Sequence, residues 1–133
     1  MPARSLPRSV MPDVPWSLAG KTYDTLASFN DAVRQYGLRI LKTDKWKPEQ
    51  RVLPAPQIAV AYEYWEGDDQ VEATVDLASD DDAGFTAGEL LFKVHNAVAA
   101  RLTGHDHHFF EGLELDKKNS LGSLPIYALR TGS

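Results

Sequence analysis

Two neighbouring runs of alternating apolar and polar residues, 57–65 and 71–78, constrain the fold more than any other part of the chain. Successive side chains of a β-strand point to opposite faces, so Ile58 and Val60 of the first run share one face, as do Val75 and Leu77 of the second. The turn between the runs contains Gly67 among acidic residues. This pattern predicts a β-hairpin that buries one face and exposes the other. The face expected in water carries Glu63, Glu72 and Asp76.

Two segments have the apolar spacing of amphipathic helices. The first begins after Asp24 or Thr25, either of which can cap it, and we expect Gly37 to end it. The second runs from 87 to about 102, where Gly104 would stop it. It follows the sequence Thr86-Ala87-Gly88-Glu89, which matches the capping-box pattern S/T-x-x-E.

The remaining strands are predicted from shorter patterns. Residues 16–23 are expected to form a hairpin around Gly20, and 38–41 a short strand. Segments 109–116 and 125–130 are expected to pair with each other, with Glu111 interrupting an apolar strand face. Trp46 lies in a Pro-containing loop, and we expect it to fold back onto the edge of the core.

This order of elements predicts an α+β fold. It would consist of an antiparallel sheet of about five to six strands with two main helices packed on one face, in the order hairpin, helix, hairpin, helix, hairpin. The 133 residues fit one domain. Residues 1–15 contain four prolines and are predicted to be a flexible arm, which leaves 16–133 as a single α+β domain.

The net charge of −5 is distributed unevenly. Residues 52–92 contain ten Asp and Glu and no Lys or Arg, whereas residues 1–51 carry nine Lys and Arg against five acids. Phosphate binding requires clustered basic residues, so the acidic block argues against a nucleic-acid partner and favours a basic protein. Cysteine is absent, and no apolar run is long enough to cross a bilayer. We therefore expect a cytoplasmic protein with no membrane or cofactor association.

Two acidic groups are the candidate partner contacts, and neither has catalytic character. One lies in the hairpin turn and the other in the loop after the hairpin. A calcium loop is excluded there, because the D-x-D-x-D-G alternation is missing. A purely structural interpretation remains open, since carboxylates also suit a helix N-terminus and a solvated surface. The candidate residues are Glu66, Asp68, Asp69, Asp80, Asp81 and Asp82.

The histidines suggest an alternative function. His105 and His107 would point the same way in a strand, and His95 could supply a third ligand, which would make a small metal-dependent or hydrolytic enzyme. His108 completes the cluster in sequence. The spacing matches no H-E-x-x-H motif, and histidines near a helix C-terminus also complement its dipole. We expect no bound metal and no catalytic residue.

Three stretches carry a family resemblance: FTAGELLFKVHNAV (85–98), DHHFFEGLEL (106–115) and PIYALRTGS (125–133). In these stretches the chain resembles small bacterial immunity proteins, the cytoplasmic antidotes to polymorphic or contact-dependent toxins. The resemblance covers roughly the C-terminal third. It implies a non-enzymatic α+β domain that binds and occludes one cognate toxin. An acidic domain would match a basic toxin, while the oligomeric state is left open.

Overall fold

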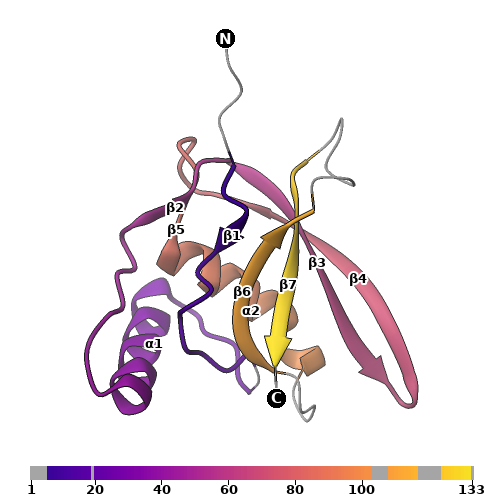
Figure 1. The fold of residues 1–133 in the computed structure, drawn as a ribbon, viewed down its shortest axis with the longest axis horizontal. Coiled ribbons are helices and arrows are strands. Elements are labelled where there is room, and N and C mark those ends of the chain that lie inside the picture. The colour runs from indigo at the N-terminus through magenta and orange to yellow at the C-terminus, as the bar shows by residue number, and fades with distance from the viewer. Residues whose placement is uncertain (1–5, 19, 103–107, 117–123, 133) are drawn as a thin grey trace.

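The computed structural model describes residues 6–18, 20–102, 108–116 and 124–132. Within these residues a five-stranded sheet has the order β1-β6-β7-β3-β4, and a separate two-stranded ladder joins β2 to β5 (Figure 1). The fold is α+β, as the sequence predicts. The elements in chain order are β1 (Ser9–Val10), α1 (Leu26–Leu41), β2 (Arg51–Leu53), β3 (Gln57–Glu66), β4 (Asp69–Ala78), β5 (Phe85–Thr86), α2 (Ala87–Leu102), β6 (Phe109–Leu115) and β7 (Ile126–Gly132).

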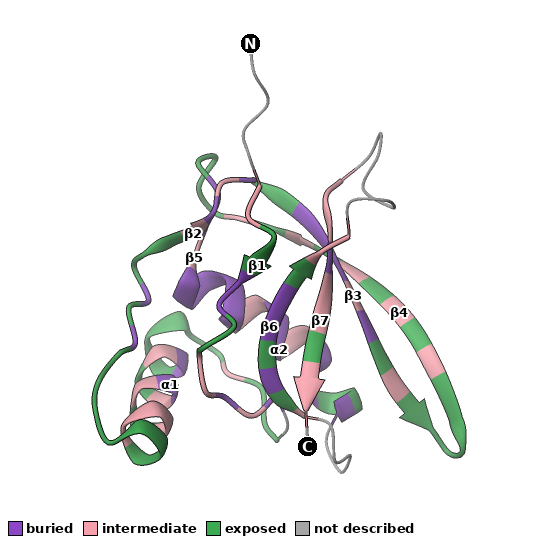
Figure 2. Cartoon of the chain, in the orientation of Figure 1, coloured by how far each residue is buried: buried purple, intermediate pink, exposed green. Residues whose placement is uncertain are grey.

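The central hairpin is confirmed with a tighter turn than expected. β3 and β4 pair along their whole length, from Gln57 opposite Ala78 to Glu66 opposite Asp69. Gly67 has φ 64° in the turn. Ile58 and Val60 are fully buried, and the opposite face of β4 is exposed (Figure 2). The alternation of apolar and polar residues therefore predicted correctly which face of the hairpin is buried.

The sheet is mixed, whereas a wholly antiparallel sheet was expected. β6 and β7 pair antiparallel as predicted, but β7 also lies parallel to β3, with Ala59 opposite Ile126 and Ala61 opposite Ala128. A parallel neighbour requires a long crossover, and here the crossover includes α2 and β6. The alternation within a strand does not specify the direction of its neighbour, so sequence periodicity could not show this arrangement.

The first helix is longer than predicted. α1 continues through Gly37 to Leu41, and Lys42 adopts φ 63° while its N–H donates to the Leu38 oxygen at 2.9 Å. The expected strand at 38–41 is therefore wrong. A single glycine costs a helix only about 1 kcal/mol, which the packing of its flanking residues can offset. The other end agrees with prediction, because the Thr25 hydroxyl accepts a hydrogen bond from the Ser28 N–H.

The N-terminal segment takes part in the sheet and the core. Within 1–15, expected as a flexible arm, β1 pairs with β6 and the side chains of Val10 and Met11 are buried. The predicted hairpin at 16–23 is absent from the described residues. Instead, Trp16 and Leu18 bond to the start of β6 through the Phe110 N–H and the His108 oxygen, at 2.8 and 2.7 Å. Burial of the apolar side chains of Val10, Met11, Trp16 and Leu18 holds this segment against the domain without a regular hairpin.

The core lies between α2 and the sheet and extends to α1. Among the described residues α2 packs against β3 and β4, while α1 packs mainly against α2 (Figure 1). Trp16 joins the two helices, with its ring centroid 5.2 Å from that of Phe29 and 5.5 Å from that of His95. Trp46 is buried, as predicted. Neither helix has the length and apolarity that a membrane-spanning helix requires.

A β-bulge changes the faces of β6. The register with β7 shifts between Phe110 and Leu113, and Gly112 has φ 101°. As a result Phe110 and Leu113 are buried, whereas Phe109 and Glu111 are exposed. Strict alternation had placed Phe109 and Leu113 on one face with Glu111 between them. The extra residue of the bulge breaks that alternation and sends Glu111 outward.

Candidate functional site

The first predicted acidic group forms the tip of the β3–β4 hairpin. Glu66, Asp68 and Asp69 are all exposed, and Glu66 lies opposite Asp69 in the ladder. Like charges placed opposite each other weaken a strand pair, so their presence here is not explained by hairpin stability.

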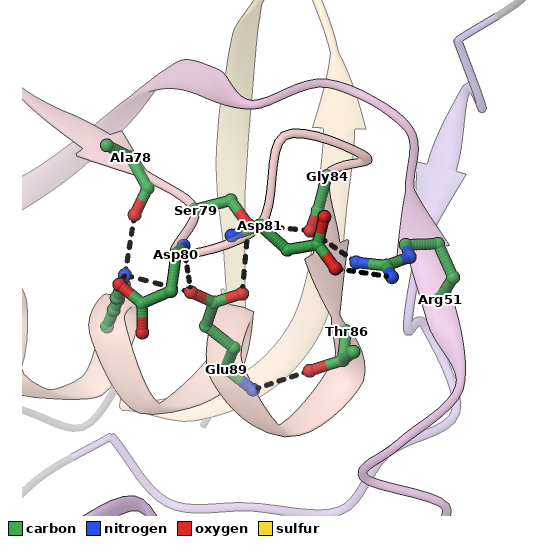
Figure 3. Close-up of polar contacts among 9 residues, drawn as sticks. Arg51, Ala78, Ser79, Asp80, Asp81, Gly84, Thr86 and Glu89 are labelled. Carbon is green, nitrogen blue, oxygen red and sulfur yellow. Dashed lines mark hydrogen bonds and ion pairs between the residues drawn. The ribbon is translucent and has the colours of Figure 1, made fainter.

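The second predicted group, in the loop from 79 to 84, is held to the scaffold by ion pairs (Figure 3). The Asp80 carboxylate lies 3.1 Å from Lys93 Nζ, and that of Asp81 lies 3.1 Å from the Arg51 guanidinium. Asp81 also accepts from the Ala83 N–H at 2.9 Å, and this bond, with the Arg51 contact, holds the pKa of Asp81 below its usual value. Asp82 is exposed. The two bases that flank the acidic block in sequence thus neutralise part of it in space.

Glu89 organises the inner side of this loop. Its buried carboxylate accepts hydrogen bonds from the Asp80 N–H at 2.7 Å, the Ser79 hydroxyl at 3.1 Å and Lys93 Nζ at 2.9 Å (Figure 3). The Thr86 hydroxyl accepts from the Glu89 N–H at 3.3 Å. Half of the predicted capping box therefore forms, while the Glu89 side chain binds the preceding loop in place of the cap residue.

The two acidic groups lie at opposite ends of the hairpin, as its length requires. Each strand has ten residues, which corresponds to roughly 30 Å. Figure 1 shows the tip and the 79–84 loop at the two ends of the β3–β4 ribbon. They cannot form one contact patch, and each must be tested separately.

A third acidic surface was not recognised as a unit from the sequence. Because β7 lies parallel to β3, the outer faces of the β3–β4 hairpin and of β6 and β7 are joined into one surface. Arg130 is the basic residue of this face among the described strands, and its Nε lies 3.6 Å from Glu114. We call this the outer sheet face, and its acidic residues are Glu63, Glu72, Asp76, Glu111 and Glu114.

The sequence held part of the signal for this surface. The alternation in β3 and β4 had already assigned Glu63, Glu72 and Asp76 to water. That Glu111 and Glu114 of β6 belong to this surface depends on the bulge and on the parallel pairing of β7 with β3. Neither feature can be recognised from the periodicity of the sequence. Trp65 lies on the same face of β3 as Glu63 and is 45% exposed, which is unusual for so large an apolar side chain.

His95 has a structural role. The Trp16 indole N–H donates to His95 Nδ1 at 3.1 Å, so the remaining proton is on Nε2, which donates to the Lys21 oxygen at 2.8 Å. The ring is 1% exposed, and burial lowers the pKa of His95. Both nitrogens are engaged, which leaves no lone pair for a metal ion unless one of these bonds breaks.

Of the other histidines, the structure describes only His108. His108 Nδ1 lies 2.8 Å from the Ser17 hydroxyl. His105 and His107 fall outside the described residues, so the predicted cluster is not tested as a whole. In the part of the chain that the structure describes, no three His, Asp or Glu side chains form a metal-binding group.

No protein-family model, curated protein or solved structure matches this chain.

Proposed function

We propose that this chain is a non-enzymatic protein-binding domain that acts as an immunity protein, binding a cognate toxin with a basic surface and occluding it. The observation that carries the proposal is the outer sheet face. No helix of the described residues covers it, and acidic side chains predominate on it (Figure 1). Soluble domains need exposed acids, but five of them beside one arginine make this single sheet face predominantly negative.

The position of the exposed tryptophan supports the same function. Tryptophan is enriched among the interface residues that contribute most to binding affinity, where its side chain is buried from solvent. Here Trp65 shares the outer face of β3 with Glu63. An apolar anchor beside carboxylates suits a protein partner that presents an apolar pocket bordered by Lys or Arg.

Electrostatic attraction gives such a domain two useful properties. Complementary charge raises the association rate from about 10⁵–10⁶ to as much as 10⁸–10⁹ M⁻¹s⁻¹ at low salt. Fast capture suits an antidote, which must bind its toxin before the toxin acts. The same surface disfavours nucleic acid, because its carboxylates repel phosphates.

The test measures binding to the protein encoded directly upstream, using three sets of charge reversals that each change three acids to lysine. The first set changes Glu63, Glu72 and Asp76 on the outer sheet face. The second changes the predicted tip contacts Glu66, Asp68 and Asp69, and the third the predicted loop contacts Asp80, Asp81 and Asp82. The sets are matched in charge, so net charge alone cannot produce a difference between them.

We expect the outer-face set to weaken binding by about tenfold or more, since opposing like charges costs several kcal/mol. The tip variant, measured under the same conditions, tests whether Glu66, Asp68 and Asp69 contact the partner. The thermal stability of the loop variant must be measured together with its binding, because Asp80 and Asp81 form ion pairs that hold the loop to the rest of the domain. Lack of binding by the wild-type protein would contradict the immunity assignment, and equal binding by all three sets would contradict the electrostatic basis.

A further inference from the structure

The five-stranded sheet is split between two of its central strands. The parallel ladder of β3 and β7 runs from Ala59 opposite Ile126 to Ala61 opposite Ala128. Beyond it β3 continues to Glu66 and β7 to Gly132, and the two strands diverge (Figure 1). The bulge in β6 lies beside this point, and bulges increase the local twist.

Two backbone hydrogen bonds of β3 show which of its N–H and C=O groups point into the gap between β3 and β7. The Pro56 oxygen accepts a hydrogen bond from the Ser79 N–H, at the start of the β3–β4 ladder. Backbone groups alternate in direction along a strand, so the N–H and C=O groups of every second residue after Pro56 point toward β4. The alternate residues point toward β7, as the bond from the Ala59 N–H to the Pro125 oxygen at 2.9 Å demonstrates. By the same alternation, the N–H and C=O groups of Glu63 and Trp65 point into the split, where the β7 ladder has ended.

Side chains enclose a cleft at this place. Its volume is about 810 Å³, within the range of roughly 300–1,000 Å³ that ligand clefts show. One wall is the end of β3 from Tyr62 to Trp65, the other is β7 from Ala128 to Thr131, and Leu102 from the end of α2 contributes to the lining. A strand placed here would have a backbone edge beside it and side chains on both flanks.

The charge of the cleft identifies the kind of strand. Its lining includes the carboxylates of Glu63, Glu72 and Glu111. Arg130 also lines it, but this guanidinium lies beside Glu114. Toward the helix side, Arg101 is occupied by Tyr62 and Tyr64, 3.2 Å from the hydroxyl of the first and 4.6 Å from the ring centroid of the second. The outer side of the cleft is therefore the acidic one.

We propose that this cleft is an acceptor for a β-strand, in which an extended basic segment of the partner protein pairs with the edge of β3 at Glu63 and Trp65, beyond the end of the described ladder with β7. The inference rests on the proposed binding function and specifies how the partner engages. The added strand would place Lys or Arg outward, against Glu63 and Glu111, and apolar side chains inward, against Tyr62 and Leu102. Main-chain bonds supply affinity in this mode, and the alternate side chains supply specificity.

Two other arrangements fit the observations less well. The outer edge of β4 is also a strand edge, but β4 is the last strand of the described sheet, so no second wall faces that edge as β7 faces β3. A second copy of this chain would bring its own acidic hairpin against an acidic cleft, at a net charge of −5 for each molecule.

The experiment uses three synthetic peptides of about ten residues. One alternates Lys and Val, a second has the same sequence with every second backbone nitrogen methylated, and a third alternates Glu and Val. Binding is measured by calorimetry, and amide hydrogen exchange is followed at Glu63 and Trp65. The methylated peptide keeps charge and apolar content but cannot pair along one edge, so it is the matched control for strand addition.

We expect saturable binding of the Lys-Val peptide, with exchange at Glu63 and Trp65 slowed about tenfold or more on saturation. Methylation should weaken binding by at least tenfold, and the Glu-Val peptide should not bind. Equal binding of the methylated peptide would overturn the proposal in favour of charge alone. Absence of binding by the Lys-Val peptide, or slowed exchange confined to β4, would overturn it as well.

A pair of variants adds a test on the protein side. Glu63→Gln removes the charge and keeps the N–H, whereas Glu63→Pro removes both, and proline is tolerated on an open strand edge. Circular dichroism checks that both remain folded, and if Glu63→Pro is unfolded the peptide comparison decides alone. We expect Glu63→Pro to bind the Lys-Val peptide at least tenfold more weakly than Glu63→Gln does. Equal affinities would overturn the pairing at this edge.

The two proposals fail in distinguishable ways. If the peptides bind through their backbone while the upstream protein does not bind, the strand acceptor stands and the immunity assignment fails. If the upstream protein binds but the methylated and unmethylated peptides are equivalent, the binding function stands and strand addition is rejected.

Discussion

The two ends of the β3–β4 hairpin contrast in how they use carboxylates. At the base, β3 is paired on both sides, Ile58 and Val60 are fully buried, and Asp80, Asp81 and Glu89 form ion pairs with Lys93 and Arg51. At the tip, β3 is paired with β4 alone, Trp65 is 45% exposed, and the acids face solvent. One end is built as scaffold, and the other has the features of a contact surface.

The contrast shows that an acidic run in a sequence does not measure the charge that a partner meets. The loop 79–84 has three successive carboxylates, yet two of them form ion pairs. Exposed ion pairs add little to stability because solvent screens them, so their main effect here is to hold the loop in place and reduce its field. Of the more dispersed acids on the outer sheet face, Glu114 alone forms an ion pair among the described residues.

The largest difference is expected between two glycines, one at each end. Gly84 has φ 116°, and a Cβ there would lie 2.0 Å from the Leu53 oxygen; Gly67 has φ 64° with nothing within 4 Å. Gly84→Ala should cost more than about 3 kcal/mol, because a backbone clash adds to the strain of positive φ. Gly67→Ala should cost about 1–2 kcal/mol. Urea unfolding of both variants checks this, and equal losses would contradict the contrast.

Valine truncation gives the next largest difference. Val60→Ala at the buried base should lower the free energy of unfolding by roughly 2–3 kcal/mol, since it removes apolar contacts and leaves a cavity. Val71→Ala, at a half-buried site near the tip, should cost less than about 1 kcal/mol. The same denaturation measurement applies. A loss at Val71 as large as that at Val60 would mean that the tip is part of the core.

The buried carboxylate at the base allows a third comparison. Glu89→Ala leaves the Asp80 N–H without its acceptor, whereas the Ser79 hydroxyl still donates to the Gly84 oxygen at 2.6 Å. The loss of this buried acceptor should cost about 1–3 kcal/mol. Asp82→Ala, in the exposed part of the same loop, should leave the thermal midpoint unchanged. Calorimetry of the two variants tests whether the loop is anchored through Glu89. An equal midpoint for both would show that it is not.

The smallest effect near neutral pH is expected from His95. Burial lowers its pKa in the folded state, so the unfolded chain, with a histidine pKa of about 6.5, binds the proton more readily. Stability should be unaffected by His95 above that pH and should fall as the pH decreases below it. The lowered carboxyl pKa of Asp81 acts in the same direction at more acidic pH, so the measurement should stay above about pH 5.

The control for this prediction is His95→Gln, whose amide can still accept from Trp16 and donate to Lys21 but does not titrate. Unfolding midpoints at about pH 7.5 and 5.5 should differ more for the wild-type protein than for this variant. If the two proteins lose the same amount of stability, the pH dependence arises from groups other than His95.

Local pattern predicted the hairpin, both helices and the pairing of β6 with β7, because these depend on periodicity and capping. It missed the continuation of α1 through Gly37, where packing outweighs a modest propensity cost. It also missed β1 and the bulge at Gly112. These features are fixed by contacts between residues far apart in the chain, which no local pattern records.

The candidate surface was only partly predictable for a related reason. Glu63, Glu72 and Asp76 were assigned to water from alternation alone. That Glu111 and Glu114 join them follows from the parallel pairing of β3 with β7, which connects segments more than sixty residues apart. Likewise, the neutralisation of Asp81 by Arg51 spans thirty residues. Charge counted along the chain could not distinguish the paired acids from the available ones.

The position of β7 has a consequence for how the protein is made. This strand lies in the interior of the sheet, between β6 and β3, yet it follows both of them in the chain. During synthesis the β3–β4 hairpin is complete long before β7 leaves the ribosome, so one edge of β3 waits without its neighbour. Unpaired strand edges on incomplete chains promote aggregation. The acids along this hairpin therefore suit the nascent chain too, since mutual repulsion keeps unfinished copies apart.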